Sequence, residues 1–247
     1  MSYQERAFRI LPAIRLHWAA TVLLTTFSLV CGTGRAQQSG APGAANGPAT
    51  QAPDAALSVD EALQKLLKGN ERFVQGTSVR PDQSPNRRTE LSFSQHPFAC
   101  IVACSDSRVP PEIIFDQGLG SIYVVRVAGN ILNDEGLGSI EYAVGTLQAP
   151  LVLVLGHSGC EAVRVAVSGQ HVSGHFDEVI DALKPAVRAT RDKPGDTLGQ
   201  AINANVELVV NRLKTSKPIL TEYVKSGRLK IIGGIYELAT GQVELLH

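Results

Sequence analysis

Two apolar runs that end in sulfur and imidazole side chains constrain the fold of this 247-residue chain more than any other feature. Phe98–Val102 leads into ACSDSRVP at Ala103–Pro110, and Leu151–Leu155 leads into GHSGC at Gly156–Cys160. In an open α/β sheet, the carboxyl ends of parallel strands meet at one edge, and binding sites lie there. The two runs therefore predict neighbouring strands that bring two sulfurs and one imidazole to the same edge.

Cys104, His157 and Cys160 are the side chains that this arrangement would bring together. Thiolate and imidazole ligands suit zinc, and three protein ligands leave one coordination position open for chemistry. His157 and Cys160 stand three residues apart on a strand-to-helix turn, so both can point at one centre. Cys100, four residues before Cys104, lies too far along the strand to share the metal, so we expect it to be a core thiol.

Asp106 and Arg108 follow Cys104 closely enough to form a second cluster of functional groups. A carboxylate at this position can reach the metal or its bound water, and a guanidinium can hold that carboxylate through two parallel hydrogen bonds. The alternative is that Asp106 caps a helix and Arg108 makes a surface ion pair. The neighbouring thiolate ligand favours the first interpretation.

Charge and cysteine content exclude several classes of function. Lys and Arg number 23, as do Asp and Glu, so the formal net charge is zero. This balance indicates neither nucleic-acid binding nor a polybasic membrane-binding patch. The chain has four cysteines, too few at this length for a disulfide framework, and metal or catalytic use is the better interpretation.

Residues 1–36 are predicted to be an export signal, which predicts a periplasmic or secreted protein. Arg6, Arg9 and Arg15 precede the apolar stretch Ala19–Val30, and small residues surround a cleavage point before Gln37. The apolar stretch is too short to span a bilayer comfortably. An uncleaved anchor and a misassigned start site are the alternatives.

Residues 37–56 are predicted to be a flexible linker, because they are rich in Gly, Ala, Pro and Gln and carry almost no charge. The folded domain is expected over residues 57–247. It should begin with a helix, since Ser58 and Glu61 form a capping box ahead of leucines at helical spacing. Residues 76–94 look like a loop or extended arm.

The rest of the domain alternates between strand and helix patterns. Strands are expected over residues 98–103, 121–127, 151–156 and 229–236, and the last should turn back into 242–246 as a hairpin. Helical patterns cover 111–115, 138–148, 160–167, 176–191 and 197–213. The first three strands are apolar along their length, as expected for strands covered on both faces. The predicted fold is α/β, with a mostly parallel central sheet flanked by helices, an N-terminal helical arm and a C-terminal hairpin strand.

The segment CSDSRV at 104–109, followed by His-x-x-Cys at 157–160, closely resembles the β-class carbonic anhydrases. The resemblance runs from about Leu57 to the C-terminus. It implies a zinc lyase that reversibly hydrates carbon dioxide to bicarbonate and a proton by zinc-hydroxide attack. It also implies that Cys104, His157 and Cys160 hold the zinc beside an Asp106–Arg108 dyad, and that the chain forms a homodimer, often paired into a tetramer.

Finer positions resemble the plant-like subgroup of that family. Gln95 stands nine residues before Cys104, where this subgroup carries Gln, and Tyr123 and Tyr142 correspond to its aromatic pocket positions. The resemblance implies that Gln95 donates to a substrate oxygen, in its own subunit or across the dimer interface. The alternative for Tyr142 is simple helix packing. Glu161 departs from the family, which usually has Gly after the last cysteine ligand.

Two other functions remain open at this point. The same fold and metal could act on a related heterocumulene such as carbon disulfide, and access to the pocket would decide between the two substrates. A non-enzymatic alternative is a zinc-stabilised or redox-responsive binding protein whose thiolates are structural.

Overall fold

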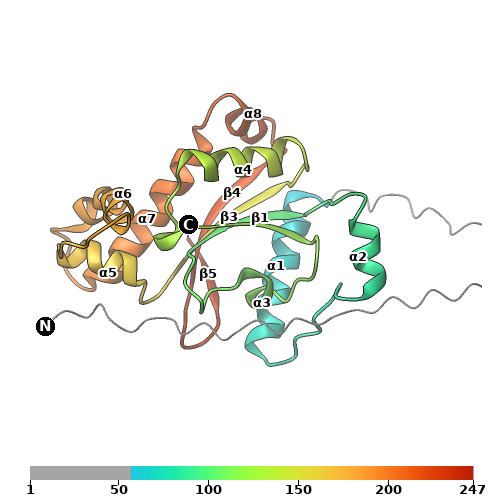
Figure 1. Ribbon diagram of the computed structural model, residues 1–247, viewed down its shortest axis with the longest axis horizontal. Helices are drawn as coiled ribbons and strands as arrows, with labels where there is room; N and C mark the ends of the chain where they lie inside the picture. Colours follow the sequence, from blue (N-terminus) through green and yellow to red (C-terminus); the bar gives the residue numbers. More distant parts are fainter. Residues whose placement is uncertain (1–56, 247) are drawn as a thin grey trace, which may run out of the picture. The chain divides into compact units, whose positions relative to one another are not determined.

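A five-stranded sheet forms the centre of the computed structural model, which describes residues 57–246 (Figure 1). The strands are β1 (Ala99–Ala103), β2 (Ile122–Arg126), β3 (Leu151–His157), β4 (Lys230–Tyr236) and β5 (Val243–Leu245). Their order is β2-β1-β3-β4-β5; β1 to β4 are parallel, and β5 runs antiparallel to β4. The predicted α/β fold with a C-terminal hairpin strand is confirmed. The predicted export signal and linker lie outside the described residues.

Helices cover both faces of the sheet. They are α1 (Val59–Val74), α2 (Pro85–Leu91), α3 (Pro111–Ile114), α4 (Asp134–Gly145), α5 (Glu161–Ser168), α6 (Phe176–Thr190), α7 (Thr197–Lys214) and α8 (Ile219–Lys225), with one 3-10 turn, η1 (Ala128–Asn130). One apolar core joins the sheet to α1 and α3, and another joins it to α4, α7 and α8. Successive residues of β1 and β3 point alternately into these two cores, as the pleat of a strand requires.

The N-terminal arm contains more helix than its sequence suggested. The capping box is present, because Ser58 accepts from the Glu61 amide while Glu61 accepts from the Ser58 amide. Residues 85–91, expected to be loop or extended arm, instead form α2. Its N-cap is Ser84, and Pro85 occupies the first helical position, where a missing N–H costs nothing.

The expectation that the first three strands are covered on both faces holds for only two of them. Every residue of β1 and β3 is buried, whereas β2 is half-buried because it lies at the edge of the sheet. Within residues 57–246, no helix is long and apolar enough to cross a membrane.

Candidate metal centre

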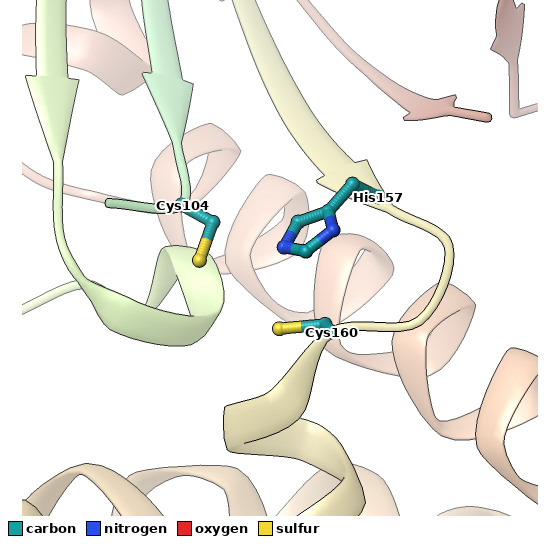
Figure 2. Close-up of side chains that lie close together, drawn as sticks. All are labelled: Cys104, His157 and Cys160. Carbon is teal, nitrogen blue, oxygen red and sulfur yellow. The ribbon is translucent and has the colours of Figure 1, made fainter. Parts of the chain in front are cut away.

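Two sulfurs and one imidazole converge at the carboxyl edge of the sheet. Cys104 follows β1, His157 ends β3, and Cys160 caps α5. Their ligand atoms all lie within 4.8 Å of one another, and the three side chains are at most 4 % exposed. Figure 2 shows the sulfurs and the imidazole turned toward a common space.

The pairing of β1 with β3 produces this convergence. Ala103 lies opposite Leu155 in the parallel register, so the two strands end side by side. Gly156 then lets α7 approach the end of β3, because a Cβ there would lie 2.6 Å from Val206 Cγ2. The site therefore depends on close helix packing as well as on its ligands.

His157 is prepared to act as a ligand through Nε2. Its Nδ1 lies 3.0 Å from the carbonyl oxygen of Ser158, which can only accept, so Nδ1 carries the proton and Nε2 keeps a lone pair. In the described part of the chain, Nε2 is fully buried and has no hydrogen-bond partner. A buried lone pair without a partner is costly unless a metal or water meets it.

The two sulfurs are arranged to carry negative charge. Cys104 Sγ accepts from the amides of Asp106 at 3.4 Å and Gly129 at 3.2 Å. The neighbouring Cys160 thiol, together with these amides, outweighs burial and holds the pKa of Cys104 well below its usual value. The same contact raises the pKa of Cys160 above its usual value, because a second thiolate would lie beside the first. A cation between the sulfurs would remove this conflict, and zinc prefers such ligands.

Arg108 holds the carboxylate of Asp106 beside the ligand cluster. Arg108 Nε donates to Asp106 Oδ1 at 2.9 Å, and Nη2 donates to Oδ2 at 2.7 Å. These hydrogen bonds are the main reason that the pKa of Asp106 falls to about 2. Asp106 Oδ2 lies 3.9 Å from His157 Nε2, which places an ionised acceptor next to the converging ligands.

Arg126 supports the same loop, and our sequence analysis did not identify it. Its Nε donates to the carbonyl of Cys104 at 3.0 Å, and its Nη2 donates to the carbonyl of Asp106 at 2.6 Å. The available signal was its position: Arg126 ends β2, at the same edge of the sheet as Cys104.

The structure does not bring the three predicted substrate-binding residues, Gln95, Tyr123 and Tyr142, together with the ligand cluster of the same chain. Gln95 is exposed and precedes β1, whereas Cys104 follows it. Tyr123 of β2 lies opposite Cys100 of β1. Cys100 comes four residues before Cys104, which corresponds to about 13 Å at the usual rise of a strand. The rings of Tyr123 and Tyr142 lie 6.4 Å apart, so the two tyrosines form one aromatic patch.

Two further side chains that lie close to the ligands in the sequence have roles in packing or at the surface. Cys100 is fully buried in the core, and burial raises the pKa of its thiol to about 12. It is therefore a core thiol, as expected. Glu161 points outward, where it accepts from Arg164 Nε at 3.0 Å.

Comparisons with known proteins agree with this site. The family model described as "Carbonic anhydrase" matches residues 99–243, which include Cys104, Asp106, Arg108, His157 and Cys160. A carbonic anhydrase of Mycolicibacterium smegmatis is 38% identical over 188 residues, which cover 74% of this chain and 91% of the relative.

Solved structures share the fold. The β-carbonic anhydrase CcaA is 28% identical, with a TM-score of 0.60 over 75% of this chain and 95% of its own. A structure from a study of two tetrameric β-carbonic anhydrases of Sordaria macrospora is 25% identical, with a TM-score of 0.61 over 74% of this chain and 96% of its own.

Proposed function

The chain belongs to the β-class carbonic anhydrases, zinc lyases that interconvert carbon dioxide and bicarbonate, and we propose that Cys104, His157 and Cys160 hold its zinc. The observation that carries this assignment is the buried Nε2 of His157, which has no hydrogen-bond partner within residues 57–246, on an imidazole whose ligand nitrogen lies within 4.8 Å of both sulfurs. Zinc bound there would act as a Lewis acid that makes hydroxide available from water near neutral pH.

Asp106 and Arg108 orient the reactants in this proposal. Arg108 uses Nε and Nη2 to keep Asp106 ionised and fixed in one orientation. Asp106 can then accept a hydrogen bond from a water in the site, and this bond turns the oxygen lone pair of that water toward carbon dioxide. Arg126 holds the carbonyls of the loop and so keeps Asp106 close to His157.

Asp106→Asn tests this role. We expect carbon dioxide hydration to fall roughly 10²-fold, the usual scale for a positioned proton acceptor, with zinc content unchanged. Stopped-flow hydration and metal analysis on the same sample measure both quantities. Glu161→Gln is the matched control, because it neutralises a nearby carboxylate that points outward, and it should hydrate carbon dioxide at the wild-type rate. Full activity in zinc-loaded Asp106→Asn would contradict the assignment.

We further propose that the chain acts as a homodimer, alone or paired into a tetramer, in which Gln95, Tyr123 and Tyr142 serve the partner's site. The position of Gln95 supports this, since it precedes β1 whereas Cys104 follows it, and five residues of strand span about 16 Å. Large apolar side chains are also exposed, among them Phe93 at 86 % and Ile113 at 59 %. Exposed apolar groups of this kind are typical of protein interfaces.

Mixed dimers test whether Gln95 acts in trans. Asp106→Asn and Gln95→Ala chains should each have low activity alone. A dimer of one chain of each kind contains one site with both native residues, so co-expression should restore hydration toward that of one intact site per dimer. If Gln95 acts within its own subunit, every site keeps one lesion and the mixture stays as inactive as its components. Sedimentation of the wild-type chain establishes the dimer or tetramer independently.

We also propose that residues 1–36 export the protein to the periplasm or the exterior and that residues 37–56 tether its catalytic domain. The support is the arginine-rich start and the apolar stretch that follows. The mature chain is expected to begin at Gln37, as intact mass spectrometry of exported protein would measure. Cytoplasmic protein that retains Met1 would contradict export.

A further inference from the structure

Asn205 connects α7 to the metal centre through a buried hydrogen bond. Its Nδ2 donates to the carbonyl oxygen of Gly129 at 2.8 Å, across 76 residues of sequence. Asn205 is 4 % exposed, and its neighbours on the buried face of α7 include Ile202 and Val206. A buried amide among apolar side chains is costly unless it is hydrogen-bonded, so this contact needs an explanation.

Gly129 links that contact to the metal site. Its amide donates to Cys104 Sγ at 3.2 Å, and it lies inside η1 in the left-handed conformation, with φ 67° and ψ 19°. A side chain at this position would meet Leu183 at 3.1 Å and Ala162 at 3.3 Å. The turn is thus packed from one side and held by Asn205 at its carbonyl, while its amide faces the sulfur.

We propose that Asn205 is a positioning residue for the zinc centre. By holding the carbonyl of Gly129, it keeps the amide of the same residue aimed at Cys104 Sγ. An amide that donates to a ligating sulfur draws electron density away from the metal bond and fixes the direction of the sulfur. Partners of this kind set both the affinity of a site for its metal and the electronic character of the ligands.

Two variants separate this role from simple packing. Asn205→Leu keeps the branched shape and the number of heavy atoms of the side chain, and it removes the donor. Asn205→Ser keeps a small polar group that cannot reach Gly129, so it decides the question if the leucine variant does not fold. Val209→Ala is the matched control, because it removes two buried methyl groups one helical turn after Asn205, from the apolar core that α7 shares with α4 and α8.

The experiment measures zinc affinity of the full chain by chelator competition, together with absorption of the cobalt-substituted protein. We expect both Asn205 variants to bind zinc about 10- to 100-fold more weakly than wild type, because the sulfur of Cys104 is then no longer held in its direction, with Val209→Ala close to wild type. The sulfur-to-cobalt band should move to longer wavelength in the Asn205 variants alone, because a sulfur with one hydrogen bond fewer holds its electrons less tightly.

Either of two results would overturn the proposal: wild-type affinity and an unshifted cobalt band in an Asn205 variant, or an affinity loss no larger than that of Val209→Ala. The inference rests on the zinc assignment above, and the same titration tests that assignment separately. Wild-type protein that binds no zinc would refute the assignment of the ligands, whereas variants that bind like wild type would refute only the role of Asn205.

Discussion

Cys160→Ser is expected to abolish carbon dioxide hydration and to lower bound zinc from about one ion per chain to a small fraction of that value. Serine has nearly the shape of cysteine, so the core around α5 should remain packed. Its hydroxyl does not ionise near neutral pH, however, and the site would lose one of its two anionic ligands. Metal analysis after dialysis and stopped-flow hydration on the same sample measure the two effects.

Cys100→Ser provides the matched control for this result. The exchange of sulfur for oxygen is identical and the residue is equally buried, but Cys100 packs in the core between the sheet and α4. We expect this variant to retain its zinc and its hydration rate. It should lose only about 1–3 kcal/mol of stability, because the new hydroxyl is buried without a hydrogen-bond partner. Zinc retained in Cys160→Ser would contradict the ligand assignment, whereas zinc loss in both variants would show that any buried exchange of sulfur for oxygen unfolds the chain.

The ligands could be predicted from the sequence because the signals for each are local. Apolar runs before Cys104 and His157 indicate buried strands, and parallel strands of one sheet must end at a common edge. The three-residue spacing of His157 and Cys160 places both on one turn. The structure adds two facts that the sequence does not contain: Nε2 of His157 has no hydrogen-bond partner in the described chain, and the imidazole and both sulfurs face a common space.

The supporting contacts could not be predicted, because their partners are far apart in the sequence. Asn205 reads as one polar residue in an apolar helix, and its partner Gly129 lies 76 residues earlier. Arg126 differs, because its place at the end of β2, opposite Ala103, was a usable signal, although its two backbone acceptors were not evident from the sequence. The prediction of a loop or extended arm over residues 76–94 was wrong at α2 for a different reason. Prolines close together suggest extended chain, whereas Pro85 occupies the first position of α2. In our proposal, Gln95 and the two tyrosines act through a second chain, and no pattern within one chain defines such an interface.

Asp116→Asn should lower the free energy of unfolding at pH 7 by about 3 kcal/mol, because it removes a buried charged acceptor. The Asp116 side chain is 2 % exposed and accepts from Arg72 Nε at 2.6 Å and from the amides of Val79 and Arg80 at 3.0 and 2.9 Å. It thereby joins α1, the following loop and the end of α3. Its φ is 44°, which asparagine tolerates, so the substitution removes charge without adding backbone strain.

Asp134→Asn is the control for this variant, because Asp134 also pairs with an arginine but is 95 % exposed. Surface pairs of this kind contribute little, and the loss of stability should stay below about 0.5 kcal/mol. Urea unfolding of both variants at neutral pH measures the difference. Equal losses at the two positions would show that burial of Asp116 has no special effect.

The effect of Asp116 should also depend on pH in a defined direction. Burial alone would raise the pKa of this carboxyl, but the hydrogen bonds from Arg72 and the two amides outweigh burial and hold the pKa below its usual value. A group with a depressed pKa in the folded state stabilises fully above its unfolded pKa, about 3.9, and that stabilisation is lost as the pH falls through the folded pKa. The stability gap between wild type and Asp116→Asn should therefore be constant near neutrality and shrink below about pH 4. A gap that grows as the pH falls would mean that the buried carboxyl binds its proton more tightly in the folded chain than in the unfolded one, contrary to the contacts that surround it.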